Sequence, residues 1–517
     1  MVRPGLLALL LATLPGAAEA QVAEAHPPIE AIEIRRVNVF SEDEAGEAFL
    51  PYGLANAIHA VTRERVIRRQ LLFDVGDPLD PARLEETERL LRAFRLFRKV
   101  SVERQGEKVV VETRDAWTLI PRVAFGRKGG LNTFELGVEE ANLLGTARRV
   151  QARYEKEVER SLWSLLYVDP QALGAHGSVR VLAQDLSDGE ALQVEAASPF
   201  YALDVARAGA ATYRFHNFDA IRYAGGEEVS RWKERSYAVR AQGGALLWNG
   251  EQSALRGIAS LEWDDTRLEA GSFGPAPPAE PLRRFLFLGV GLESEGRRWL
   301  KLRNVDQIDR DEDFNLAPTF AIEAAAAPRV SGARAAGRFR GGGSAGVDWP
   351  WGFALGSLSG ETRLDGGPRA SRLGAEVRAY AVRQGITLAA RVAYTRLGRP
   401  DPEQFLELDG LNGMRGYRAH AISGTERFVA NLEARLFAFS DVLHLFSLGA
   451  ACFYDEGFSS GAPDRYQRVT DAGVGLRLGL TRASQHALLR IDLARSLRPD
   501  PQGRTGWLLS FATGQAF

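Results

Sequence analysis

The chain has 517 residues, with 65 Lys and Arg against 66 Asp and Glu, so its formal net charge is −1. This balance gives no general attraction to polyanions, and we expect no nucleic-acid partner. A single cysteine excludes an internal disulfide framework and a multi-cysteine zinc site, and the seven histidines are widely scattered. We therefore expect neither a metal nor a cofactor. The sequence contains no nucleophile-and-base constellation, which predicts that the protein is not an enzyme.

The beginning of the chain has the pattern of a secretory signal peptide. Arg3 precedes an apolar run that ends at Leu14, and small residues precede Gln21. The apolar run is shorter than the roughly 20 residues of a membrane-spanning helix. We predict a signal peptide at 1–20, a polar leader at 21–28 and a mature chain that leaves the cytoplasm.

Residues 29–117 predict a compact domain of β-α-α-β-β order. Its clearest element is a helix with Asp80 as N-cap and Pro81 in the first position, where proline loses no needed hydrogen bond. Apolar side chains recur at helical spacing in the helices and alternate in the strands. The predicted elements are a strand at 32–39, a helix at 62–73, the helix from Asp80, and strands at 100–103 and 108–113.

From residue 118 onward, short alternating runs separated by turn residues replace the helical spacing. Ile386 and Leu388 share the apolar face of one run, and Glu433 and Arg435 lie between the apolar residues of another. Two architectures produce this alternation. A soluble sandwich buries the apolar faces in its core, whereas a transmembrane barrel turns them to lipid and keeps polar residues in a watery lumen.

The end of the chain distinguishes the two architectures. Trp507, Leu509, Phe511 and the final residue, Phe517, lie on one side of the last predicted strand. An aromatic carboxy-terminus is typical of the closing strand of an outer-membrane barrel. We predict a mainly β fold, a transmembrane antiparallel β-barrel over 118–517 with an α+β domain before it. At about 25 residues for each strand with its connection, this length holds about 16 strands.

Four segments, at 409–417, 453–457, 139–145 and 29–117, resemble parts of the outer-membrane assembly factors of the BamA/TamA type and the related two-partner secretion transporters. Residues 409–417 (DGLNGMRGY) are similar to the lumen-loop motif Val/Leu-Arg-Gly-Phe/Tyr of that family, and 453–457 (FYDEG) to its Phe-x-Asp-x-Gly strand. Residues 139–145 (EEANLLG) look like the first barrel hairpin, and 29–117 look like one POTRA domain. The resemblance assigns the lumen-loop motif to Gly413, Met414, Arg415, Gly416 and Tyr417, the ion-pair partner to Asp455, the supporting strand motif to Phe453 and Gly457, and the C-terminal barrel signal to Phe517.

The resemblance implies insertion or translocation of outer-membrane or secreted polypeptides without ATP. It also implies the outer membrane of a Gram-negative bacterium as the location, with the POTRA-like domain in the periplasm. The implied partners are the lipid bilayer, an unfolded client polypeptide and accessory periplasmic proteins. The domain is either an inert spacer or a docking site for an extended client at a strand edge. A passive solute channel and a structural surface-antigen barrel are the alternative functions.

The role of Arg415 can also be argued from the chemistry of its side chain. Gly413 and Gly416 flank it and allow a tight turn. A guanidinium inside a barrel needs a carboxylate, which its planar fork binds bidentately. We hypothesise that the loop folds into the lumen and is held by an Arg415–Asp455 pair, so that charge reversal at both positions restores function lost in each single variant. The alternative is a surface turn with a solvated arginine.

Three further features predict no chemistry. The glycine-rich segment 341–346 matches G-x-G-x-x-G but lacks a following helix, so it indicates a strand or turn. Cys452 is expected to be a small buried residue of the strand that carries Asp455. The cluster at 264–267 (DDTR) is expected to be the polar end of a hairpin, because no catalytic constellation accompanies it.

Overall fold

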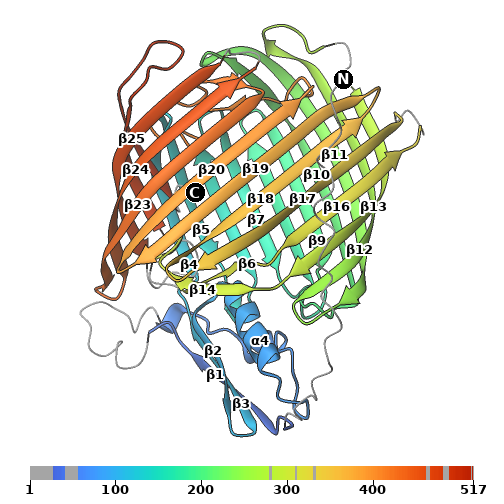
Figure 1. The fold of residues 1–517 in the computed structure, drawn as a ribbon, viewed down its shortest axis with the longest axis vertical. Helices are drawn as coiled ribbons and strands as arrows, with labels where there is room; N and C mark the ends of the chain where they lie inside the picture. Colours follow the sequence, from blue (N-terminus) through green and yellow to red (C-terminus); the bar gives the residue numbers. More distant parts are fainter. Residues whose placement is uncertain are drawn as a thin grey trace.

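The computed structural model describes residues 27–40, 56–278, 282–308, 311–329, 334–461, 466–480, 488–513 and 515. The predicted signal peptide, most of the leader and Phe517 lie outside these residues. The chain forms an N-terminal α+β unit beneath a closed β-barrel (Figure 1). Neither of the two described α-helices in the N-terminal unit is long and apolar enough to cross a membrane.

The N-terminal unit has the predicted β-α-α-β-β order. Asp80 accepts a hydrogen bond from the amide of Ala82, and Pro81 opens the second helix, as the sequence predicts. The helix predicted at 62–73 is only one turn long, because Leu72 donates its amide to Thr87 of the second helix instead of continuing the first. The elements are β1 (Ala31–Val37), α3 (Glu64–Arg68), α4 (Pro81–Ala93), β2 (Phe97–Gln105) and β3 (Lys108–Asp115).

β3 is the central strand of the three-stranded sheet, parallel to β1 and antiparallel to β2. The helices bury apolar side chains against one face of the sheet, which gives the unit its own core. Ile67 and Leu91 from the helices meet Val109 and Val111 from β3, all at most 1% exposed. The sheet order leaves β1 and β2 as the two edge strands, which the sequence pattern does not reveal.

In the part of the chain that the structure describes, twenty strands close the barrel. The last of them, β27, lies beside β4 (Figure 1). The even number puts the first and last strands antiparallel, as in single-chain bacterial barrels. The strands are β4 (Leu119–Lys128), β5 (Leu131–Glu140), β6 (Arg149–Lys156), β7 (Ser161–Asp169), β8 (Ser178–Leu186), β9 (Gly189–Ser198), β10 (Arg207–Ala224), β11 (Glu227–Asn249), β12 (Ser253–Phe273), β13 (Leu282–Gly296), β16 (Thr319–Ala327), β17 (Ala336–Trp349), β18 (Gly352–Leu364), β19 (Pro368–Arg383), β20 (Ile386–Gly398), β23 (Glu426–Val442), β24 (Phe446–Ser460), β25 (Gln467–Leu480), β26 (Leu488–Ser496) and β27 (Trp507–Thr513).

The prediction of about 16 strands is too low, because the average of about 25 residues for a strand with its connection is too long. Many connections are tight turns. Only Gly225 and Gly226 join β10 to β11, and only Gln384 and Gly385 join β19 to β20. Glycine accepts the positive φ of such turns, 57° and 82° at the first pair.

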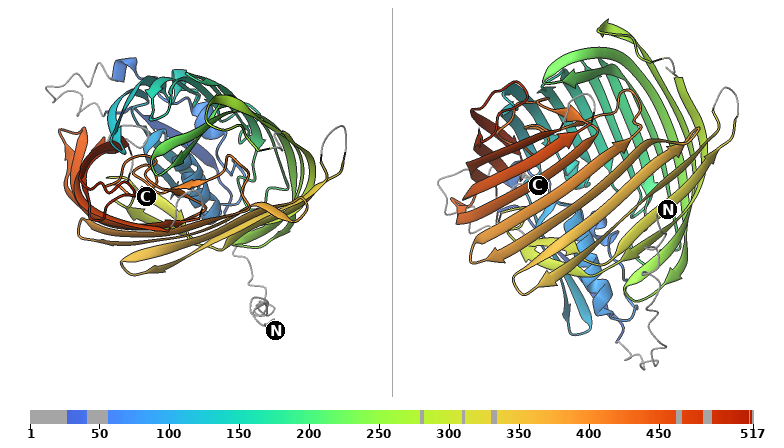
Figure 2. Two further views of the ribbon diagram at one scale, coloured as in Figure 1. Left: turned by 90° about the horizontal axis from the view of Figure 1, so that it is seen from above. Right: turned by 45° about the horizontal axis from the view of Figure 1, so that its top comes forward.

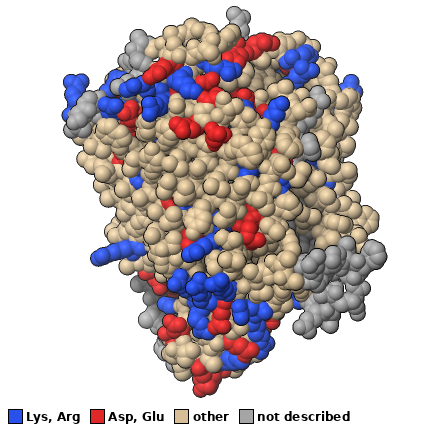
Figure 3. Space-filling view, turned by 180° about the vertical axis from the view of Figure 1, so that it is seen from behind, with Lys and Arg blue, Asp and Glu red and all other residues tan. Residues whose placement is uncertain are grey.

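The outer face of the barrel is apolar. Val290 is 69% exposed and Val392 is 43% exposed, whereas Phe287 and Thr387, on the opposite faces of the same strands, are at most 2% exposed. On the face that Figure 3 shows, a broad band with few charges crosses the barrel, and Lys, Arg, Asp and Glu concentrate above and below it. A soluble sandwich would bury these apolar faces, so this arrangement is the one expected of a transmembrane barrel.

Two expectations about single segments are wrong. Cys452 is exposed on the outer face of β24, not buried, because alternation turns the intervening residues outward when Asp455 points inward. Residues 264–267 lie inside β12, not at a hairpin end, because this strand is longer than its apolar run suggests. The glycines at 341–346 lie in β17, as expected.

Alternate connections lie at opposite ends of the barrel. β4 starts at the N-terminal unit, so we call that end proximal and the other end distal. The connections at 141–148 and 297–318 are therefore proximal, and the long connection at 399–425 is distal. Residues 139–145 end β5 and begin the proximal turn to β6. Glu139 and Glu140 therefore belong to the first hairpin, β4–β5, and the rest of the segment belongs to the turn that follows it.

A buried carboxylate fixes the junction between the unit and the barrel. Asp115 accepts hydrogen bonds from the amide and the hydroxyl of Thr62 at 2.8 and 2.9 Å, and lies 3.0 Å from His59. Asn142 of the proximal turn donates to the same Thr62 hydroxyl at 2.8 Å. The unit is thus tied to the barrel by hydrogen bonds between buried groups, which are costly to break.

A hairpin inserted between β13 and β16 makes a second junction. β14 (Trp299–Arg303) and β15 (Asp311–Asn315) pair antiparallel at the proximal end (Figure 1). On one side, Arg92 of α4 donates to both carboxylate oxygens of Asp313, at 2.9 and 3.1 Å. On the other, Phe314 packs on the lumen-facing Phe353 of β18, with ring centroids 4.5 Å apart. Ile308 reaches Leu488 of β26, so the hairpin segment lies across the proximal mouth of the barrel.

Candidate functional site

The distal connection at 399–425 folds back into the barrel as an ordered loop. A short ladder pairs β21 (Leu406–Glu407) with β22 (Ser423–Gly424) at its base. Asp409 organises the interior of the loop, because its carboxylate accepts the amides of Leu411, Asn412 and His420. These bonds close the loop on itself, so it enters the lumen as a preformed body. Figure 2 shows segments of the chain inside the outline of the ring.

Arg415 lies at the inner tip of this loop, and its side chain is only 5% exposed. Its Nε and Nη2 donate to the two carboxylate oxygens of Asp455 at 2.8 and 2.9 Å, and Nη1 donates to Glu433 at 2.6 Å. The guanidinium carbon lies 3.4 Å from the centre of the Phe453 ring, a cation–π contact. Arg415 is therefore held by the bidentate bond to Asp455, by the Glu433 carboxylate and by the face of the Phe453 ring. It is not the solvated arginine of a surface turn.

Alternation along β24 brings the three motif residues of this strand to one face. Phe453, Asp455 and Gly457 all point into the lumen and are buried. A Cβ at Gly457 would meet Met414 Sδ at 2.9 Å and Leu408 at 2.8 Å. The glycine therefore leaves the space that Met414 fills, in an apolar cluster of fully or almost fully buried side chains. The cluster comprises Leu408, Met414, Tyr417, Ala421, Ile422, Val429 and Val469.

The two glycines of the loop motif are required by different contacts. Gly413 has φ 105°, which favours glycine, and its carbonyl accepts the side-chain amide of Asn431 at 2.8 Å. Gly416 lies against the wall, where a Cβ would come within 2.6 Å of Asp471 and 3.0 Å of the amide of Ser496. Any side chain at this position would push the loop away from β25 and β26.

The loop also touches both sides of the place where the barrel closes. The Tyr417 hydroxyl accepts the amide of Thr470 at 2.9 Å and lies 2.8 Å from the carbonyl of Arg498, next to the final strands. The amide of Ala419 donates to the carbonyl of Gly129, in the turn of the first hairpin, at 2.9 Å. The loop thus spans the distal side of the β27–β4 junction.

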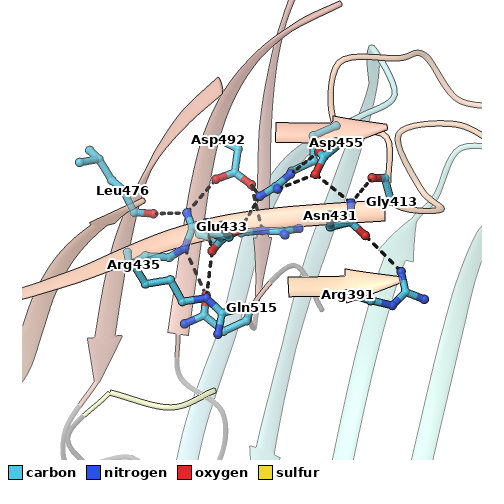
Figure 4. A network of polar contacts seen from close by, with 12 residues as sticks. Arg391, Gly413, Asn431, Glu433, Arg435, Asp455, Leu476, Asp492 and Gln515 are labelled. Carbon is cyan, nitrogen blue, oxygen red and sulfur yellow. Dashed lines mark hydrogen bonds and ion pairs between the residues drawn. The ribbon is translucent and has the colours of Figure 1, made fainter. Parts of the chain in front are cut away.

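Arg415 belongs to a wider network of buried charges, of which Glu433, Arg435, Asp455 and Asp492 are labelled in Figure 4. Glu433 on β23 accepts from Arg435 at 3.1 Å and from Arg477 at 2.9 Å in addition to Arg415. Arg477 also donates to Asp492 on β26 at 2.7 Å, and Asp492 lies 3.7 Å from Arg415. Three arginines thus meet three carboxylates, which come from β23, β24 and β26. Removing one partner leaves a buried charge uncompensated, which typically costs about 3–5 kcal/mol.

Sequence reasoning found Asp455 but missed Glu433, Arg477 and Asp492. Each lies on the polar face of a strand whose alternation is visible in the sequence. The missing information is the register between strands, which sets β23 against β24 and β25 against β26. Alternation gives the face of a residue but not its height along the barrel wall. Phe517 lies outside the described residues, so its predicted role stays a prediction.

One group of the loop has the donor types of a metal site. Carboxylates of Glu407 and Asp409 lie close to the ring of His420. However, His420 Nδ1 and a Glu407 oxygen are hydrogen-bonded at 2.6 Å, and the Asp409 oxygens accept the loop amides described above. These donors serve the internal structure of the loop, so the group gives no reason to revise the expectation of a protein without a metal.

No family model matches the chain, and no curated protein matches its sequence. Among solved structures, it is similar to the BamA of Haemophilus ducreyi lacking POTRA domains 1–3 (12% identity, TM-score 0.42), with 94% of this chain and 84% of that chain covered. It is also similar to CdiB of Escherichia coli (12%, TM-score 0.47; 95% and 76% covered) and to the FrpB iron transporter of Neisseria meningitidis (11%, TM-score 0.41; 79% and 83% covered). These similarities are distant and include different activities, so they carry no statement about the activity of this chain.

Proposed function

We propose that this chain inserts proteins into the outer membrane, or translocates polypeptides across it, as the motif resemblance implies. The barrel spans the outer membrane, and residues 29–117 form a POTRA-like domain in the periplasm. The observation that carries the proposal is the position of Arg415. A loop tip is fixed inside the barrel by carboxylates from β23 and β24, in a network that also includes β26. Buried charges inside a membrane barrel are expensive and mark functional sites.

The loop is suited to hold the barrel wall in a defined shape. It bonds to strands on both sides of the β27–β4 junction, through Tyr417 and Ala419. A factor that handles polypeptides needs a barrel that stays sealed to small solutes between clients. The energy for the process comes from client folding, because the site offers no nucleotide chemistry.

A passive solute channel is the competing function, because the lumen is lined with charges on the wall away from the loop as well. Arg338 donates to both oxygens of Glu262, at 2.9 and 3.0 Å. Against this function, the distal loop occupies the lumen and the β14–β15 hairpin crosses the proximal mouth. A channel needs a continuous aqueous path, and these two segments lie at opposite ends of any such path.

Depletion of the protein followed by a quantitative census of outer-membrane proteins tests the proposal. The expected result is the selective loss of a small set of outer-membrane or secreted proteins, with their unfolded precursors in the periplasm. An unchanged census combined with reduced uptake of a small solute would instead identify a channel. An unchanged census with normal uptake would leave a structural barrel, and either result would reject the proposal.

A further inference from the structure

The hairpin of β10 and β11 rises above its neighbour β9 at the distal end of the barrel. β9 pairs with β10 only as far as Asn217, whereas the pairing of β10 with β11 continues to Ala224. We call residues 218–230 the hairpin tip. The ladder is shifted between Arg222 and Tyr223, and an irregularity of this kind bends a strand. On the side of β9, the hairpin tip therefore depends on contacts with other segments.

The distal loop supplies one of these contacts through His420. Its imidazole ring is stacked on Tyr223 of the hairpin tip, with ring centroids 3.8 Å apart and an interplanar angle of 4°. Its Nδ1 lies 2.6 Å from Glu407 Oε1 in the loop, and its Nε2 lies 3.6 Å from Glu159 Oε1 in the β6–β7 turn. The side chain of His420 is only 7% exposed. One buried side chain thus joins the distal loop to two hairpins of the barrel wall.

This geometry suits a protonated imidazole. A protonated ring donates from both nitrogens, whereas a neutral ring donates from only one and presents a lone pair on the other. A neutral His420 between two ionised carboxylates would therefore turn a lone pair toward one of them. The flat stack on Tyr223 also places a positive ring over an aromatic face. Protonation thus strengthens all three side-chain contacts of His420.

The charges around His420 come from each segment that packs on it. Burial by itself would lower the pKa of the imidazole, but the hydrogen bond to Glu407 and the charges of Glu407, Glu159 and Asp409 raise it above its ordinary 6.5. Tyr223 contributes an uncharged phenol. Further charged groups beside these are Arg160 near Glu159, Glu228 and Arg231 near Tyr223, and Arg427, which donates to the backbone carbonyl of Glu407.

The contacts of His420 should therefore weaken as pH rises. A histidine with a pKa raised by folding stabilises the folded chain fully below its ordinary value, about 6.5, and this stabilisation is lost as pH rises through the folded value. Burial raises the pKa of Glu407 too, so the loss of its proton acts in the same direction. The guanidinium of Arg415 stays charged throughout this range. Deprotonation should thus loosen the distal end of the loop and leave its inner tip in place.

We propose that His420 is a proton-dependent latch on the distal mouth of the barrel. When protonated, it ties the distal loop to the hairpin tip and to the β6–β7 turn, and when neutral it releases both. Release widens the mouth without withdrawing Arg415 from its carboxylates. The latch does not depend on what passes through the barrel. In the orientation proposed above, it faces the outside of the cell and responds to the external pH.

Hydrogen exchange of residues 218–224 and 417–422 in the full mature chain in detergent tests the latch between pH 7.0 and 9.0. His420→Asn is the reference, because asparagine tolerates the φ of 58° at this position, can donate to Glu407 and cannot titrate. Dividing the wild-type rate by the rate of this variant removes the intrinsic pH dependence of exchange. We expect this ratio to rise about three- to tenfold across the range, the size of one lost hydrogen bond.

Two further variants separate a titrating latch from a structural contact. His216→Gln is the matched control, because His216 lies 3.0 Å from Glu234 and stacks on Phe218 within the same hairpin. It should keep the wild-type pH response of 417–422. Glu159→Gln removes one charge that helps His420 to keep its proton, so it should shift the midpoint of the response to lower pH. A contact that only supports the structure would not move this midpoint.

Conductance in planar bilayers tests whether the latch controls the mouth. Wild type and His216→Gln should open more often at pH 9.0 than at pH 7.0, and His420→Asn should open equally often at both. The increase should be modest, because the proximal hairpin stays in place. A constant exchange ratio, or an unmoved midpoint in Glu159→Gln, would overturn the latch. An unchanged outer-membrane census after depletion would reject the proposed function alone, because these assays use the isolated barrel.

Discussion

Arg435 joins the two segments that occupy the barrel. Its Nη1 donates to the backbone carbonyl of Val305, in the proximal hairpin segment, at 2.7 Å, and its Nε donates to Glu433 at 3.1 Å. Glu433 in turn accepts from Arg415 at the tip of the distal loop. A path thus runs from the N-terminal unit through the partly buried Arg92–Asp313 pair, along the hairpin and through the buried Arg435–Glu433 contacts to the distal loop.

This path predicts that Arg435→Gln loosens both segments. Loss of a charged hydrogen bond on each side should raise hydrogen exchange in 299–308 and 409–420 by about tenfold, equivalent to about 1.4 kcal/mol. Mass spectrometry of the exchanged chain measures both segments together. Arg396→Gln is the control, because Arg396 is 62% exposed and pairs with Glu426 at the barrel rim. Loosening of one segment alone would show that Arg435 does not join them.

The two segments should each limit ion flow. Replacement of 410–419 by a flexible linker leaves the proximal hairpin in place, and replacement of 299–315 leaves the distal loop in place. In planar bilayers we expect low, flickering conductance from the wild-type barrel, a modest increase from each replacement and a large steady conductance only when both are made. Steady conductance from the unaltered barrel would favour the passive channel.

The docking of the hairpin should depend on pH through Glu312. Burial, with the nearby charge of Asp306, raises the pKa of this carboxyl from its ordinary 4.5 to about 7. Between these two values the folded state keeps a proton that the unfolded state releases, so stability falls as pH rises through this window and levels off above about 7. Exchange of 299–308 should therefore be slower at pH 5.5 than at pH 7.5.

Glu312→Gln supplies the comparison at each pH. The glutamine keeps an oxygen that can accept the amides of Val305 and Gln307, and it cannot ionise. Dividing the exchange rate of the wild-type chain by that of the variant removes the intrinsic pH dependence of exchange. We expect this ratio to rise between pH 5.5 and 7.5. A constant ratio would show that Glu312 does not control the docking.

Because the apolar faces of the strands point outward, a charged side chain on the outer face should destabilise the barrel in lipid, and the loss of stability should depend on its depth in the bilayer. Val392 lies midway along β20 and is 43% exposed on the outer face. Val392→Arg should destabilise the barrel in lipid by about 2–4 kcal/mol, the cost of arginine near the bilayer midplane. Val392→Leu should change stability little. Urea titration of refolding into liposomes measures both variants, and a tolerated arginine would contradict contact with lipid.

The sequence predicted the local elements more completely than it predicted the residues of the site. The Asp80–Pro81 helix start and the outward apolar faces follow from rules that act within one element. The number of strands was missed because it depends on loop lengths, which the alternation does not fix. The sequence pattern does not reveal the β14–β15 hairpin, because its packing on Phe353 and α4 involves partners far away in the sequence.

The ion network also depends on partners that lie far apart in the sequence, so the sequence predicted only part of it. The expectation that charge reversal at Arg415 and Asp455 restores function assumed an isolated pair. Arg415 also contacts Glu433 and lies near Asp492, so an aspartate at 415 would face two carboxylates. We now expect the reversed pair to fail. The motif identified one partner, and the register of three other strands supplies the rest.

Complementation after depletion tests the central claim most directly. The measured quantity is the recovery of the depleted outer-membrane proteins at equal barrel levels. Wild type should restore them, and Arg415→Lys should fail, because lysine keeps the charge but cannot form the fork to Asp455 together with the bond to Glu433. Arg418→Lys, three residues along the same loop at an exposed position, should restore them like wild type. Full recovery with Arg415→Lys would contradict the account.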